Sequence, residues 1–213
     1  MGCGCGKKKK VVSLFTAGRP IRRVNQPNTN IVINSTNEAT TNNSTTEDIE
    51  YITNISPSDW GPLLWKLFHI MAERIGNSGV DSLDRDMAIA LEFILEHIPH
   101  ILPCFECQNH ARTYIRSHPF NQIKNKRGIE LQNFVRQYFF EFHNHVRIST
   151  GKPITIATVD ECKKLYENIQ WQKCEMEQAT EYFSFGVHHS IIKAELYKRW
   201  MAQVHKLRLI AGF

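Results

Sequence analysis

Apolar residues recur at helical spacing through most of the chain after residue 57, and this periodicity constrains the fold more than any other feature of the sequence. In the segment 82–98, one side of an α-helix would carry Leu83, Met87, Leu91, Ile94 and Ile98. Strand-like alternation of apolar and polar residues never lasts beyond a few positions. The sequence therefore predicts an all-α protein.

Proline and glycine residues indicate where the predicted helices begin and end. The stretch 56–59 is typical of a helix start with Asp59 as the N-cap, and this helix should end near Arg74. Pro99 and Pro103 should bound the connection after the second helix. The remaining helices are expected over 82–98, 104–118, 129–149 and 158–171, with one or two more between 175 and 207. Four long helices with short connections favour a four-helix bundle with a short fifth helix and extra C-terminal helices.

The beginning of the chain differs in composition from the rest. Residues 25–49 are dominated by Asn, Thr, Ser and Glu, and such a segment cannot bury enough apolar surface to offset the entropy lost on ordering. We expect residues 1–56 to form a disordered arm, residues 57–175 to form one domain, and residues 176–213 to form a C-terminal helical extension.

The net charge of +5 does not indicate a basic folded domain. Lys7 to Lys10, together with Arg19, Arg22 and Arg23, exceed that charge by themselves. The predicted helices are therefore close to neutral and give no support for a nucleic-acid-binding core. No apolar run approaches the roughly 18 residues of a membrane span, and the first ten residues lack the apolar stretch of a secretory signal. These features give no sign of a membrane span or of a secretory signal.

Cys104 and Cys107 form a Cys-x-x-Cys motif with apolar, helix-like sequence on both sides. Two cysteines at this spacing can close a small disulfide ring, and the N–H groups and dipole of a helix start favour a thiolate there. The same spacing provides half of a zinc site, but Cys162 and Cys174 are twelve apart and His110 stands alone. The motif therefore favours dithiol–disulfide exchange, with zinc binding or plain packing as alternatives.

Two clusters of rings and cations flank this motif in the sequence. Trp65 and His69 are four residues apart, so they share a face of the first predicted helix. His143 and Arg147 have the same spacing at the end of the fourth, with Lys152 just beyond it. Each cluster alone would be ordinary core packing. Together, flat rings and cations suit a flat ring system joined to phosphates.

Three motifs in this chain resemble those of one known family. W-G-x-x-x-W-x-x-x-H, P-C-x-x-C and H-N-x-V-x-x-x-x-G-K-P stand in that order within residues 57–175. This order resembles the Erv/ALR-type FAD-linked sulfhydryl oxidases, whose members occur in mitochondria, the secretory pathway and large DNA viruses. The resemblance implies a four-helix bundle with a short fifth helix, FAD at one end of the bundle, and a homodimer. A viral member would act in the host cytoplasm or the virion.

The resemblance also implies roles for individual residues. Cys104 and Cys107 would be the redox pair, with Cys107 next to the flavin and Cys104 exchanging with the substrate. The residues that would bind FAD are Trp60, Gly61, Trp65, His69, His143, Asn144, Val146, Arg147, Lys152, Pro153 and Trp171. Arg147 replaces an asparagine of the family pattern, and its guanidinium could still meet a phosphate. Cys162 and Cys174 would form a structural disulfide, although the family's later pair is usually more widely spaced. No metal is implied.

The activity implied by the resemblance is FAD-dependent oxidation of protein thiols in the domain 57–175. Electrons from a substrate would pass through Cys104 and Cys107 to FAD and then to molecular oxygen, giving a substrate disulfide and hydrogen peroxide. The alternative from another class is a zinc-stabilised helical interaction module without catalysis, and a third interpretation is an oxidase fold kept as a scaffold. The ring clusters argue against the zinc module, and the intact cysteine pair argues against the scaffold.

The extreme N-terminus has two functional interpretations. Gly2 could be myristoylated and Cys3 and Cys5 palmitoylated, with Lys7–Lys10 attracted to anionic lipid, which predicts membrane contact. Gly6 leaves the myristoylation motif incomplete. Alternatively, Cys3 and Cys5 could form a second dithiol on a flexible arm that carries electrons to the inner pair, as family members often do. The simplest alternative is a solvated basic tail.

Overall fold

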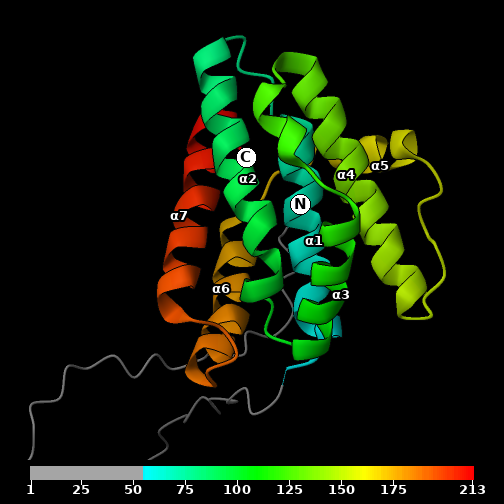
Figure 1. Ribbon diagram of the computed structural model, residues 1–213, viewed down its shortest axis with the longest axis vertical. Coiled ribbons are helices and arrows are strands. Elements are labelled where there is room, and N and C mark those ends of the chain that lie inside the picture. The colour runs from blue at the N-terminus through cyan, green and yellow to red at the C-terminus, as the bar shows by residue number, and fades with distance from the viewer. Residues whose placement is uncertain (1–54) are drawn as a thin grey trace, which may run out of the picture. The chain divides into compact units, whose positions relative to one another are not determined.

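The computed structural model describes residues 55–213, and every regular element in that range is helical (Figure 1). The elements are α1 (Pro57–Arg74), α2 (Asp81–Ile101), α3 (Phe105–Ser117), the 3₁₀ helix η1 (Asn121–Asn125), α4 (Gly128–Ser149), α5 (Val159–Tyr166), α6 (Lys173–His188) and α7 (Ala194–Ala211). The all-α prediction is confirmed. No helix in this range is both long and apolar enough to cross a membrane. The predictions for Gly2, Cys3, Cys5 and most of the N-terminal arm lie outside the described residues.

The first helix begins earlier than its predicted cap. Ser56, and not Asp59, is the N-cap, because the Ser56 hydroxyl accepts a hydrogen bond from the backbone N–H of Ser58. The Asp59 carboxylate accepts in return from the backbone N–H of Ser56 at 2.7 Å. This reciprocal capping box fixes the start of the helix that carries Trp60 and Trp65.

The second helix continues through Pro99 instead of ending before it. Its buried face carries the predicted Met87, Leu91, Ile94 and Ile98. Leu83, which was expected on that face, is 38% exposed. Pro99 is itself buried, so packing outweighs the backbone hydrogen bond that proline removes. The connection from α2 to the cysteine motif is correspondingly short.

A buried ion pair joins α1 to α4. Arg136 donates from Nε to one carboxylate oxygen of Glu73 at 2.7 Å and from Nη2 to the other at 2.8 Å. A buried pair of this kind is costly to break, because removal of one partner leaves an uncompensated charge. The ion pair therefore fixes the position of α1 along the axis of α4. It thereby also fixes the positions of His69 and His143 relative to each other.

The two C-terminal helices pack against α1 and α2 and share their core (Figure 1). Trp200 of α7 is fully buried, and its indole N–H donates to the carbonyl oxygen of Ile94 in α2 at 3.2 Å. Phe183 of α6 lies beside it, with ring centroids 6.0 Å apart. The boundary predicted at residue 176 lies within α6, and buried side chains on its two sides belong to one hydrophobic core.

Candidate functional site

Cys104 and Cys107 form a disulfide at the start of α3, with their Cα atoms 5.2 Å apart. Cys104 is the N-cap of this helix, and its sulfur accepts a hydrogen bond from the backbone N–H of Cys107 at 3.2 Å. Within residues 55–213, no group of three or more His, Cys, Asp or Glu side chains could hold a metal ion. The helix start directs an N–H group and the positive end of its dipole at the Cys104 sulfur, which favours a thiolate there when the disulfide opens.

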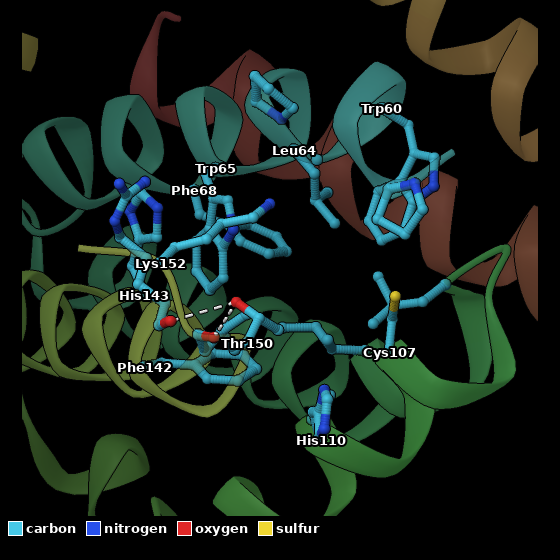
Figure 2. A pocket seen from close by; sticks show the side chains of 18 of the residues that line it. Trp60, Leu64, Trp65, Phe68, Cys107, His110, Phe142, His143, Thr150 and Lys152 are labelled. Carbon is cyan, nitrogen blue, oxygen red and sulfur yellow. Dashed lines mark hydrogen bonds between the residues drawn. The ribbon is translucent and has the colours of Figure 1, made fainter. Parts of the chain in front are cut away.

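A cavity of about 370 Å³ lies next to Cys107, between side chains of α1, α3 and α4 (Figure 2). Figure 2 shows Cys107 and Trp60 on one side of this cavity and His143 with Trp65 on the other. Its wall also contains the apolar side chains of Leu64, Phe68, Ile98, Leu102, Ala111 and Phe142. A mostly apolar cavity of this size with a few polar groups is typical of a cofactor or small-ligand site.

The two ring clusters predicted on α1 and α4 meet at the side of the cavity away from Cys107. Trp65 and His143 stack face to face, with ring centroids 4.3 Å apart and planes 7° from parallel. Nε2 of His69 lies 3.0 Å from Nδ1 of His143. His69 in turn stacks on Tyr166 of α5, with centroids 4.8 Å apart. The four rings form one connected group from three helices.

Both histidines in this group are held in the neutral form. Burial, with a smaller effect of His143, lowers the pKa of His69 to about 3. Burial, with a smaller effect of the Arg147 guanidinium, lowers the pKa of His143 to about 4. At neutral pH the pair therefore offers flat rings and hydrogen-bonding nitrogens, and no positive charge.

Positive charge at the cavity comes from Arg147 and Lys152, both of which line it. Arg147 donates from Nε to the carbonyl oxygen of Pro153 at 2.6 Å, and its own carbonyl accepts from the backbone N–H of Lys152 at 2.8 Å. Gly151 turns the chain between them with φ of +67°, a conformation that few other residues adopt at a helix end. An anionic group would be favoured beside these two cations.

Seven of the predicted FAD-binding residues line the cavity: Trp60, Gly61, Trp65, His143, Val146, Arg147 and Lys152. Four others do not. His69 lies behind His143, and Asn144 donates at 3.5 Å to the carbonyl of Ile156. Pro153 holds Arg147 through its carbonyl. Trp171 is 3% exposed and belongs to the hydrophobic core.

The predicted disulfide between Cys162 and Cys174 is not formed, because both cysteines are free. Cys162 is buried on α5, and its sulfur lies 3.3 Å from Nδ1 of His69. Cys174 is half-buried in the first turn of α6. The packing of α5 against α1 thus directs the Cys162 thiol into the bundle. Burial, as the largest cause, raises the pKa of Cys162 to about 12, so the sulfur keeps its proton at neutral pH.

Several residues of the wall were missed by sequence reasoning. His110 lies three positions after Cys107 on α3, and this helical spacing could have indicated that it faces the same cavity. Thr150 donates from its hydroxyl to the carbonyls of Val146 and Arg147 at 2.8 and 3.2 Å (Figure 2). Tyr166 gave no local signal, because its place in the wall depends on how α5 packs.

Features of this wall fit the flavin nucleotide that the family resemblance implies. Trp60 is buried, and its indole N–H has no hydrogen-bond partner in residues 55–213, so a bound acceptor would satisfy it. A Cβ added at Gly61 would meet nothing within 4 Å, so the backbone of α1 is open to a flat ring here. Arg147 and Lys152 provide the charge that suits a diphosphate.

Comparison with known proteins agrees with this arrangement. The sequence model of the Erv1/Alr family matches residues 62–172, just over half of the chain. Protein 347L of Invertebrate iridescent virus 6, provisionally named an FAD-linked sulfhydryl oxidase, is 29% identical over 108 residues, which are 51% of this chain and 94% of that protein. Protein 096R of Invertebrate iridescent virus 3, with the same provisional name, is 36% identical over 99 residues, which are 46% of this chain and 61% of that protein. No solved structure matches significantly. This chain therefore belongs to the Erv1/Alr family.

Proposed function

We propose that this protein is an FAD-dependent thiol oxidase that forms disulfides in protein substrates. The observation that carries the proposal is the position of Cys107, one half of a disulfide, in the wall of a cavity that fits a flavin nucleotide. The provisional names of the two viral relatives support it. The disulfide also favours this proposal over a zinc-stabilised module, because zinc binds thiolates, and neither sulfur of a disulfide is one.

Exchange with the substrate begins at Cys104. A substrate thiolate forms a bond to the Cys104 sulfur, the bond between Cys104 and Cys107 breaks, and Cys107 leaves as a thiolate. A second substrate thiolate attacks the substrate sulfur of this mixed disulfide, so the new disulfide stays with the substrate and Cys104 leaves as a thiolate. The backbone N–H that points at the Cys104 sulfur stabilises this leaving group.

The two cysteines have different surroundings that suit different roles. Cys107 lines the cavity and Cys104 does not, while Phe105 between them is 65% exposed. This supports Cys104 as the sulfur that meets protein substrates and Cys107 as the sulfur next to the flavin. When bound, FAD supplies the two-electron acceptor that returns the pair to the disulfide and passes the electrons to molecular oxygen, giving hydrogen peroxide.

We further propose that the seven cavity-lining residues named above contact FAD. Arg147 and Lys152 would bind its phosphates, and the stacked Trp65 and His143 would bind a ring face. His69 does not line the cavity, so it would act on FAD only through its contact with His143. Asn144, Pro153 and Trp171 would support the wall without touching the cavity. The homodimer, the membrane contact and the cytoplasmic location stay predictions.

The test is the visible spectrum of the purified full chain before and after anaerobic addition of a dithiol. We expect a flavin absorption band that bleaches with the dithiol and returns in air, with hydrogen peroxide formed. Cys104→Ser and Cys107→Ser should keep the band, because neither variant removes the cavity, and should lose thiol-dependent oxygen consumption.

Cys174→Ser is the matched control, because it removes a free thiol outside the cavity and should leave oxygen consumption unchanged. A colourless protein that does not bind added FAD would overturn the proposed function. Normal oxygen consumption by Cys107→Ser would show that the electrons take another route.

A further inference from the structure

Cys162, His69 and His143 form a chain of close polar contacts that thiol exchange does not use. The Cys162 sulfur lies 3.3 Å from Nδ1 of His69, and Nε2 of His69 lies 3.0 Å from Nδ1 of His143. The chain runs from a buried thiol on α5, through α1, to a residue of the cavity wall on α4. It thus connects the free cysteine of the interior to the candidate FAD site.

We propose that Cys162 is a positioning residue, whose S–H group donates to His69 and thereby fixes the tautomer of His143 that faces the cavity. With the S–H at Nδ1 of His69, the single proton of that neutral ring must lie on Nε2. His69 then donates to Nδ1 of His143, which places the proton of His143 on its own Nε2. Each group in the chain donates one hydrogen bond.

The opposite direction of donation is less favourable. It would require His143 to donate to His69, and His69 to donate to the thiol sulfur, which is a weak acceptor. It would also leave the S–H without an acceptor, since Cys162 makes no other hydrogen bond within residues 55–213. The raised pKa of Cys162 supports the chosen direction, because a protonated thiol has a hydrogen to donate.

The rings of the chain are held in place by stacking. Tyr166 lies on His69, with planes 24° from parallel. Trp65 covers His143, with planes 7° from parallel. Stacked rings resist rotation about the Cβ–Cγ bond, which would put the ring carbons Cδ2 and Cε1 in the places of Nδ1 and Nε2, so the tautomer and the orientation are fixed together.

The consequence is a neutral hydrogen-bond donor in the cavity wall. Nε2 of His143 has no hydrogen-bond partner among residues 55–213, and His143 lines the cavity. Its N–H would meet an acceptor of the dinucleotide, such as a ring nitrogen, a ribose hydroxyl or a phosphate oxygen. This last step rests on the proposed function, whereas the direction of hydrogen-bond donation from Cys162 through His69 to His143 does not.

The test combines nitrogen NMR of the histidine rings with FAD titration, both on the full-length protein stripped of flavin. In the wild type we expect His69 and His143 to carry their protons on Nε2 near neutral pH, with the His143 signals identified by their loss in His143→Gln. Cys162→Ala should leave Nδ1 of His69 without a donor, produce mixed tautomers, and weaken FAD binding about 2- to 10-fold, the worth of one hydrogen bond.

Two further variants separate this role from packing. Cys162→Ser keeps a hydrogen-bond donor and should restore the Nε2 tautomers and FAD binding. The serine side chain is closer in volume to alanine than to cysteine, so a purely packing role predicts that Cys162→Ser behaves like Cys162→Ala. Cys174→Ala removes the other free thiol and should change neither measurement. If Cys162→Ala fails to fold, the tautomers of the wild type and of Cys162→Ser still test the direction of donation and the role of Cys162.

Several outcomes would overturn the inference. A proton on Nδ1 of His69 in the wild type would show that the hydrogen bonds are donated in the opposite direction. Unchanged tautomers in Cys162→Ala would show that Cys162 does not set them. Wild-type protein that binds no FAD would instead overturn the proposed function, and the tautomer result would stand by itself.

Discussion

His69 and His143 are buried as neutral rings, and this ties the stability of the protein to pH. In the unfolded chain each ring would have its ordinary pKa of 6.5, compared with about 3 and about 4 in the folded protein. As the pH falls below 6.5, the unfolded state binds protons that the folded state does not bind. The free energy of unfolding therefore decreases on acidification and levels off below the folded pKa values.

We predict that His143→Gln makes stability less dependent on pH. Each buried histidine changes the free energy of unfolding by up to about 1.4 kcal/mol per pH unit between its folded and unfolded pKa values. The variant should remove the contribution of His143 between pH 6.5 and about 4. The measurement is urea unfolding at a series of pH values. His205→Gln, which changes an exposed ring on α7, is the control. Equal pH slopes for His143→Gln and the wild type would contradict the prediction.

At the scale of helices, a glycine brings the C-terminal pair close to the redox disulfide. A Cβ at Gly186 of α6 would lie 2.6 Å from Cδ1 of Ile192 and 3.0 Å from Cβ of Pro103, the residue before Cys104. The Gln108 amide, on α3, donates to the carbonyls of Leu102 at 2.9 Å and Ile191 at 3.3 Å. The turn between α6 and α7 is therefore attached to the segment that carries Cys104.

We predict opposite effects of alanine at Gly186 and at Gly61. Overpacking by Gly186→Ala should lower the free energy of unfolding by about 1–3 kcal/mol. The higher helix propensity of alanine should offset up to about 1 kcal/mol of this loss. Gly61→Ala meets no neighbour within 4 Å, so it should keep the propensity gain while it narrows the cavity and weakens FAD binding. Urea unfolding and FAD titration of both variants provide the test. A Gly61→Ala variant with full FAD affinity would place the flavin elsewhere.

Local elements were predictable from the sequence, and contacts between distant elements were not. The end of α1 and the approximate bounds of α3 and α4 follow from apolar spacing and from proline and glycine, which act within a few residues. The passage of α2 through Pro99 depends on burial against other helices. The free Cys162 could not be predicted either, because its partner His69 is 93 residues away. Seven of the residues that the resemblance named for FAD binding line the cavity, and their contact with FAD stays a proposal. The two later cysteines, for which the resemblance implied a disulfide, are free.

At the scale of the whole molecule, the extra C-terminal helices are part of the core. The buried side chains of α7, Trp200, Val204 and Leu207, form a stripe at helical spacing, and they belong to the same hydrophobic cluster as those of α1 and α2. A Cβ added at Gly186 would lie 3.0 Å from Cβ of Pro103, so α6 also lies close to the segment that precedes α3. Residues 176–213 therefore contribute both to folding and to the position of the disulfide.

We predict that a chain ending at residue 175 lacks a cooperative unfolding transition, because it exposes the apolar face of α2 that α7 covers. Trp200→Ala is the milder change and should cost about 3–5 kcal/mol, from the cavity it leaves and the lost hydrogen bond to Ile94. Leu209→Ala is the control on the same helix. Leu209 is 86% exposed, so its loss should change stability by less than about 0.5 kcal/mol. Urea unfolding followed by circular dichroism measures all three. A shortened chain that unfolds cooperatively and retains flavin would instead support residues 57–175 as an independent domain.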